Sequence, residues 1–275
     1  MISPPPLLAV IAAIFGLCVG SFLNVVVWRL PRGESVVWPG SHCPHCGHDL
    51  PWFHNIPLVS WLLLSGRCGF CSAAISIQYP ALELLSAGLW VLLTLPSAGG
   101  MGSLPPLLNL LAGGVLLSLL LPLALIDART MQLPEPLCRW GVISGLGLSA
   151  AVGVLQGNGA QLLLWHATAA ATGLLAFEAI STGAERMLGV PALGLGDAKL
   201  AALLGAWLGL RGLGLAIASA VILGALFGVV GRLSGRLGPR QPFPFGPFLV
   251  AGGVLSWIAA DAISWVLLQP DRLGV

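Results

Sequence analysis

The sequence predicts an all-α, polytopic membrane protein of about eight transmembrane helices with a small zinc-ribbon-like cytoplasmic insertion. The first observation is composition: 57% of the 275 residues are hydrophobic and only 8% are charged. Soluble domains carry roughly 25% charged residues, so this composition excludes a water-soluble globular enzyme and a nucleic-acid-binding protein. The second is the arrangement of apolar residues in long runs, and the third is a polar loop that holds two C-x-x-C pairs.

Eight apolar segments are expected to span the membrane, because a helix needs roughly 20 apolar residues to cross the hydrocarbon core. The second and sixth are short, and the sixth and seventh nearly merge around Arg211-Gly212, so seven spans remain an alternative. The 37 glycines suit close helix–helix approach in lipid. The expected spans are 7–28, 80–96, 104–126, 138–156, 160–181, 198–210, 213–231 and 247–268.

The basic residues are distributed unequally between the two sides of these spans. Only Arg211 and Arg272 fall on one side, and the other ten fall on the opposite side. Loops rich in Lys and Arg stay in the cytoplasm, so the ten-residue side is predicted to be cytoplasmic and both termini to lie outside it. Membrane lipid is therefore an expected partner. The ten residues are Arg29, Arg32, Arg67, Arg129, Arg139, Arg186, Lys199, Arg232, Arg236 and Arg240.

The loop between the first two spans carries a candidate metal site. Cys43 and Cys46 form one pair, Cys68 and Cys71 the other, and 21 residues separate the pairs. Four thiolates at this spacing suit one tetrahedral zinc ion, which would stabilise a loop too short to build its own core. Gly47 and Gly69 are expected where the turns need a permissive backbone. A redox dithiol, or substitute ligands from His42, His45 and His48, are the alternatives.

Two aspartates stand where predicted spans meet the cytoplasmic face. Asp127 ends the third span and Asp197 opens the sixth, within Gly194-Leu195-Gly196-Asp197. Neighbouring carboxylates can share a proton, so that one activates water and the other acts as an acid. Gly194 and Gly196 would let a substrate backbone approach and would permit positive φ. The alternative is that both aspartates only cap helices. Glu83, Glu178 and Asp261 are interpreted as helix-packing or interface groups.

Several motifs, in order, resemble the type IV prepilin peptidase family. They begin with Gly20-Ser21-Phe22-Leu23-Asn24 and continue through the paired cysteines to Gly66-Arg67-Cys68 and Tyr79-Pro80…Glu83. Ile126-Asp127…Leu133-Pro134, Gly194 to Asp197 with Lys199, and Pro244-Phe245-Gly246-Pro247 complete the series. Glu135 departs from the family, in which aspartate commonly follows Leu-Pro.

The resemblance implies a bacterial inner-membrane aspartic endopeptidase that removes the leader of type IV prepilins and pseudopilins on the cytoplasmic side, after a glycine. It implies Asp127 and Asp197 as catalytic residues, Gly194, Gly196 and Lys199 as their support, and the four cysteines as zinc ligands. Members with the cysteine loop also methylate the new amino terminus with S-adenosylmethionine, but the residues that bind this methyl donor stay unknown.

The expected division is a first helix (1–28), a zinc-binding loop associated with methyl transfer (29–79) and a membrane-embedded peptidase domain (80–275). No nucleic acid is expected as a partner, and the sequence does not indicate an oligomeric state. A peptidase without methyltransferase activity, a proton-coupled transporter and a non-catalytic scaffold are the alternative functions.

Overall fold

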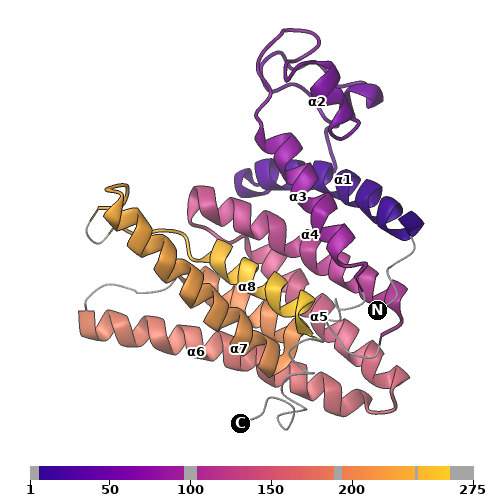
Figure 1. Ribbon diagram of the computed structural model, residues 1–275. Coiled ribbons are helices and arrows are strands. Elements are labelled where there is room, and N and C mark those ends of the chain that lie inside the picture. The colour runs from indigo at the N-terminus through magenta and orange to yellow at the C-terminus, as the bar shows by residue number, and fades with distance from the viewer. Residues whose placement is uncertain (1–5, 96–103, 189–193, 239–240, 261–275) are drawn as a thin grey trace, which may run out of the picture. The chain divides into compact units, whose positions relative to one another are not determined.

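The computed structural model describes residues 6–95, 104–188, 194–238 and 241–260. The chain forms two compact units, Met1–Pro96 and Ser97–Val275, which we call unit 1 and unit 2. Within the described ranges the regular structure is helical, and β structure is limited to two isolated bridges in the cysteine loop. The all-α prediction is therefore confirmed (Figure 1).

Unit 1 is built on two helices that pack against each other and that lie next to the cysteine loop in Figure 1. These are α1 (Pro6–Arg29) and α3 (Gln78–Leu92), and between them lie the cysteine loop with η1 (Leu30–Arg32), η2 (Trp52–Asn55) and α2 (Val59–Leu63). Gly16 and Gly20 of α1 face α3, and a Cβ on either would come within 2.7 Å of an α3 Cα atom. Small residues four positions apart thus allow the two backbones to touch, as is common between membrane helices.

Asn24 fixes the register of α1 and α3. Its side chain is buried, donates to the carbonyl oxygen of Tyr79 at 3.2 Å and accepts a hydrogen bond from Gln78 at 3.3 Å. A buried amide that forms hydrogen bonds is tolerated in the fold, whereas a buried amide without hydrogen bonds would destabilise it. The start of α3, where the cysteine loop ends, is therefore held against the last turns of α1.

Unit 2 is a bundle in which α7 packs against α5, α6 and α8, and α8 also packs against α4. Its core is formed by leucine, alanine and tryptophan side chains of these helices, such as Leu120, Leu203 and Trp207. The helices are α4 (Pro106–Thr130), α5 (Glu135–Leu155), α6 (Gly159–Leu188), α7 (Leu195–Leu233) and α8 (Gly246–Ile258).

A break at Gly209 divides α7 into two helical parts. Gly209 has φ 66° and ψ −177°, outside the helical region, and such a φ is readily adopted only by glycine. The two expected spans 198–210 and 213–231 correspond to these two parts. They are continuous in sequence and lack the connecting loop that separate spans would have.

Five helices of the described residues are long and apolar enough to cross a membrane, namely α1, α4, α5, α6 and α7. The chain is thus a multi-pass membrane protein, as expected. Helix α3 has 15 residues, and α8 has 13 within the described part, so both are shorter than a full span. The ends of the expected spans 80–96 and 247–268 lie outside the described residues, as does Asp261.

The boundary between the compact units follows Pro96. Helix α3 belongs with α1 in unit 1 because it packs along that helix. This structural boundary differs from the functional boundaries expected after residues 28 and 79. The functional division stays a prediction.

Candidate active site and metal centre

Asp127 lies near the end of α4, where the start of α8 covers its carboxylate. Its side chain is buried, with 5% of the residue exposed. The backbone N–H of Gly246, the first residue of α8, donates to Asp127 Oδ2 at 2.9 Å. A Cβ on Gly246 would come within 2.6 Å of the same oxygen. Only glycine therefore leaves room for the carboxylate at this contact.

Asp197 lies in the first turn of α7 and is also buried, with 9% exposed. Its Oδ2 accepts a hydrogen bond from the N–H of Gly194 at 3.2 Å, and its own N–H donates to the Gly194 carbonyl at 3.0 Å. A carboxylate here also faces the positive end of the helix dipole. Asp197 therefore does cap the start of α7, as the alternative interpretation expects. This capping fixes the position of the carboxylate and is compatible with a chemical role.

Unit 2 brings the two aspartates into one site. Their carboxylates, from helices α4 and α7, are close enough for the charge on Asp127 to act on Asp197. Both accept a backbone hydrogen bond at one oxygen. Two buried carboxylates whose charges act on each other cannot both ionise easily, and this is the condition under which the carboxylate pair of an aspartic protease divides the roles of acid and base.

The glycines near Asp197 act through their size. The expectation of positive φ is wrong for Gly194, which has φ −74° and ψ 148°, and Gly196 is not among the positive-φ residues. A Cβ on Gly196 would instead lie 3.0 Å from the Cβ of Leu133, which follows α4. The segment after α4 can therefore pack closely on the first turn of α7.

Lys199 connects α7 to α5 through its side chain. Its Nζ lies 3.1 Å from Oε2 of Glu135 and forms an ion pair with it. No other ion pair is present among the described residues. Both side chains are more than two-fifths exposed, so solvent screens the interaction. Lys199 contributes to holding the α5 and α7 starts together and does not form an ion pair with either aspartate.

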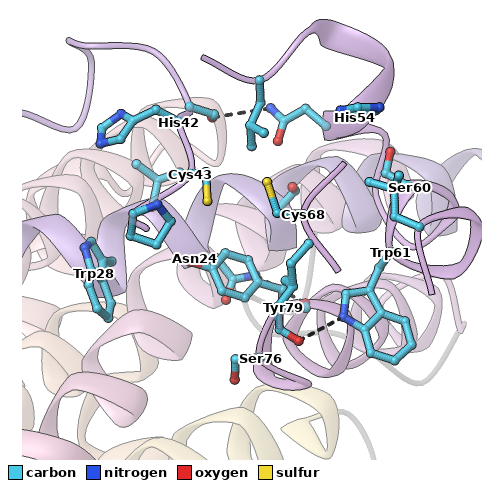
Figure 2. A pocket seen from close by; sticks show the side chains of 18 of the residues that line it. Asn24, Trp28, His42, Cys43, His54, Ser60, Trp61, Cys68, Ser76 and Tyr79 are labelled. Atoms are coloured by element: carbon cyan, nitrogen blue, oxygen red, sulfur yellow. Dashed lines mark hydrogen bonds between the residues drawn. The ribbon is translucent and has the colours of Figure 1, made fainter. Parts of the chain in front are cut away.

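The four cysteines of unit 1 converge as the spacing predicts. The sulfur atoms of Cys43, Cys46, Cys68 and Cys71 all lie within 4.8 Å of one another. Cys43 Sγ and Cys71 Sγ are 3.8 Å apart, about the sulfur–sulfur separation expected around a zinc ion with Zn–S bonds of ~2.3 Å. In Figure 2 the sulfurs of Cys43 and Cys68 point toward each other from two separate turns.

Two similar backbone turns hold the cysteine pairs. In the first, Cys43 N–H donates to the His48 carbonyl and Gly47 N–H to the Cys43 carbonyl. In the second, Cys68 and Ser72 donate in the corresponding pattern to Ala73 and Cys68. The bridges His42–Asp49 and Arg67–Ala74 close both turns at the same offset. The chain therefore builds two equivalent halves of one tetrahedral site.

The expected glycine roles in these turns are half right. Gly47 has φ 70°, as expected. In the second turn the left-handed residue is Ser72, with φ 58°, and Gly69 does not have positive φ. A Cβ on Gly69 would lie 2.8 Å from the His54 ring, so the second glycine is needed for space.

Local hydrogen bonds favour the thiolate form of one cysteine. The backbone N–H groups of Cys71 and Phe70 lower the pKa of the Cys68 thiol to about 7. Metals bind thiolates, so the low pKa of Cys68 suits coordination, whereas desolvation and the neighbouring sulfurs raise the pKa of the Cys71 thiol to about 11. The four sulfurs in one cluster fit a single metal ion such as zinc better than two independent redox dithiols. With four protein ligands the ion would have a structural role.

Sequence reasoning missed three contributors to these sites. In the sequence Gly246 is only part of a motif, and no local pattern indicates that its N–H contacts Asp127. Arg29 was counted only as a cytoplasmic charge, yet it is buried and donates to the carbonyls of Pro39 and Gly40 at 2.7 and 2.9 Å. Glu83, interpreted as a packing group, lies in the wall of a cavity beside the cysteine turns.

The fold and these sites define a class: a multi-pass membrane protein with paired buried carboxylates in one unit and a four-cysteine cluster in the other. The family models match accordingly. Residues 14–96 match the bacterial peptidase A24 N-terminal domain, and residues 114–229 match the type IV leader peptidase family. No solved structure matches the chain significantly.

Curated relatives agree with the family models. A prepilin leader peptidase/N-methyltransferase of Myxococcus xanthus is 42% identical over 236 residues, covering 86% of this chain and 67% of that protein. Proteins of the same name from Aeromonas hydrophila and Neisseria gonorrhoeae are 35% and 33% identical, with 92% and 97% of both chains covered. The chain therefore belongs to the type IV leader peptidase family, and the expected resemblance is confirmed. The transporter alternative finds no support among these relatives.

Proposed function

We propose that this protein is an integral-membrane aspartic endopeptidase that cleaves the leader from type IV prepilins and pseudopilins and then N-methylates the new amino terminus. One observation carries the peptidase assignment: α4 and α7 bring the buried carboxylates of Asp127 and Asp197 into one interacting pair. Family membership and the names of the relatives support both activities.

In the proposed reaction the two aspartates share one proton. The ionised carboxylate takes a proton from water, whose oxygen attacks the carbonyl carbon of the scissile bond, while the protonated partner donates to the carbonyl oxygen. In the collapse of the tetrahedral intermediate, the carboxyl that took the water proton gives it to the leaving nitrogen, the other carboxylate recovers a hydroxyl proton, and the C–N bond breaks. The leader leaves with a new carboxylate, and the mature chain leaves with a new amine.

The environment of the pair suits this chemistry. Gly246 and Gly194 each donate one N–H to a carboxylate oxygen and so orient the two groups before substrate arrives. Orientation of this kind reduces the reorganisation needed in the transition state. The absence of a side chain at Gly194, which is exposed, leaves space beside Asp197.

The proposed location is the bacterial inner membrane, with both termini in the periplasm and the aspartate pair at the cytoplasmic face. The ten-to-two distribution of basic residues supports this orientation. The prepilin's apolar helix would then dock among the spans from the lipid, with its basic leader in the cytoplasm. Prepilin or pseudopilin and membrane lipid are the proposed partners.

The proposed roles in unit 1 are zinc binding and methyl transfer. Cys43, Cys46, Cys68 and Cys71 would hold a structural zinc ion that fixes both turns. S-adenosylmethionine, when bound, supplies an electrophilic methyl group for the new amine. The chain's own contribution is to bind the donor and to present the amine in its neutral form.

Mass spectrometry of a cognate prepilin incubated with the protein in liposomes and S-adenosylmethionine tests the proposal. We expect a product that lacks the leader and is heavier by one methyl group. Leader loss without the methyl would retain the peptidase and remove the transferase. An intact substrate would contradict the whole proposal.

A further inference from the structure

We propose that the cavity of unit 1 between α1, α3 and the cysteine turns binds S-adenosylmethionine, with Glu83 facing its positive charge. This inference rests on the proposed methyl transfer and assigns it a site. The cavity has a volume of about 340 Å³, which lies within the usual range for small-molecule sites, roughly 300–1,000 Å³. All its lining residues belong to residues 21–83, so unit 1 forms it alone.

Glu83 places a buried carboxyl group in the wall of the cavity. The residue is 5% exposed, and its Oε2 accepts a hydrogen bond of 2.8 Å from the backbone N–H of Leu58. No described basic side chain forms an ion pair with it. A buried carboxylate without a cation is costly, so a positively charged ligand would be favoured at this wall.

Arg29, the one arginine or lysine among the lining residues, is already engaged. The Arg29 guanidinium donates to the carbonyls of Ser35, Pro39 and Gly40 and so supports the entry of the cysteine loop. It is therefore not available as a counter-ion for Glu83. S-adenosylmethionine carries a sulfonium and an ammonium group, and both are cations of the kind that this carboxylate would attract.

The lining also contains aromatic side chains that suit the adenine ring. Figure 2 shows Trp61 at the right of the view, with Tyr79 and Asn24 nearer the centre, below the cysteine sulfurs. Trp61 is fixed by its Nε1–H, which donates to the Ile75 carbonyl at 3.3 Å. Rings held in place present a flat apolar surface to a purine and a favourable face to a cation.

The cysteine turns form another wall of the cavity. Cys43 and Cys68 both line it, and Cys68 N–H is tied to Ala73, another lining residue. A metal ion held by the four thiolates would therefore set the shape of the donor site. This explains why a methyltransferase region would contain a structural metal.

Binding is measured on the full-length protein in nanodiscs by equilibrium dialysis of radiolabelled S-adenosylmethionine, without prepilin. Glu83→Gln keeps an oxygen that can accept from Leu58 and removes the charge. We expect it to weaken binding about tenfold or more and to lower the methylated fraction of the cleaved product. Glu185→Gln, which makes the same change at an exposed carboxylate of unit 2, is the matched control and should bind as wild type does.

Val25→Phe provides a second variant that fills the cavity from α1 and leaves the charge in place. It should also weaken binding. If either variant unfolds at the same temperature as wild type and also binds the donor as tightly as wild type, the cavity assignment is overturned. Glu83→Gln that binds the donor normally but methylates poorly would overturn it too, because the carboxylate would then serve the amine. A wild-type protein that cleaves but neither binds donor nor methylates would instead remove the methyl-transfer half of the proposed function.

Discussion

The N–H of Gly246 lies 2.9 Å from Oδ2 of Asp127, and this hydrogen bond joins the start of α8 to the end of α4 across 119 residues of sequence. The contact leaves no space for a side chain, because a Cβ at residue 246 would lie 2.6 Å from that oxygen. The position of one carboxylate of the pair thus depends on the backbone of a helix far away in the chain.

Gly246→Ala should therefore reduce prepilin processing strongly. The added methyl group must move Asp127 or the start of α8, and a displacement near 1 Å can cost about 100-fold in rate. Initial cleavage rates in liposomes measure the effect. Gly214→Ala, which adds a Cβ with no neighbour within 4 Å in the same unit, is the control. Equal rates for Gly246→Ala and wild type would show that the contact does not position the carboxylate.

The ion pair between Lys199 and Glu135 should contribute little. Both side chains are largely exposed, and such pairs contribute about 0–1 kcal/mol to the free energy of unfolding. Lys199→Gln should therefore change stability by no more than this and leave cleavage within about threefold of wild type. Denaturant unfolding in detergent and cleavage assays provide the measurements. A tenfold loss of activity with unchanged stability would assign Lys199 a role in substrate contact.

Metal content tests the cysteine cluster. The purified protein should contain one zinc ion per chain, and Cys68→Ser should lose most of it, because three thiolates hold the ion less tightly than four. Cys18→Ser, which removes an exposed thiol outside the cluster, should retain the metal. Elemental analysis of wild type, Cys68→Ser and Cys18→Ser measures the zinc content of each protein. Full zinc content in Cys68→Ser would point to a substitute ligand such as a neighbouring histidine.

Close packing of α1 on α3 depends on Gly20. A Cβ there would lie 2.7 Å from the Cα of Glu83, so Gly20→Val must separate the two helices at the cavity wall. We expect a lower melting temperature, with a loss of about 1–3 kcal/mol typical of overpacking. Gly88→Ala on α3, where a Cβ meets nothing within 4 Å, should melt as wild type does. Unchanged melting of Gly20→Val would show that the helices can separate without loss.

The sequence predicts most of this architecture because the relevant signals are local. Apolar run lengths identified the membrane helices, and the C-x-x-C spacing identified residues that do converge. The break at Gly209 was not foreseen as a continuous kinked helix, because Arg211-Gly212 reads equally well as a short loop. The roles of Gly246 and Glu83 depend on tertiary contacts, with α4 and with the segment around Leu58, and no local pattern encodes them.

The central claim is that Asp127 and Asp197 act together as the catalytic pair. The most direct measurement is the cleavage rate of a cognate prepilin by Asp127→Asn, Asp197→Asn and the double variant in liposomes. Asparagine keeps the size and hydrogen-bond acceptor of each side chain but cannot exchange the proton. We predict that each single variant loses at least about 1,000-fold in rate and that the double variant loses little more, because the two residues act as one unit. Near wild-type cleavage by either single variant would contradict the account.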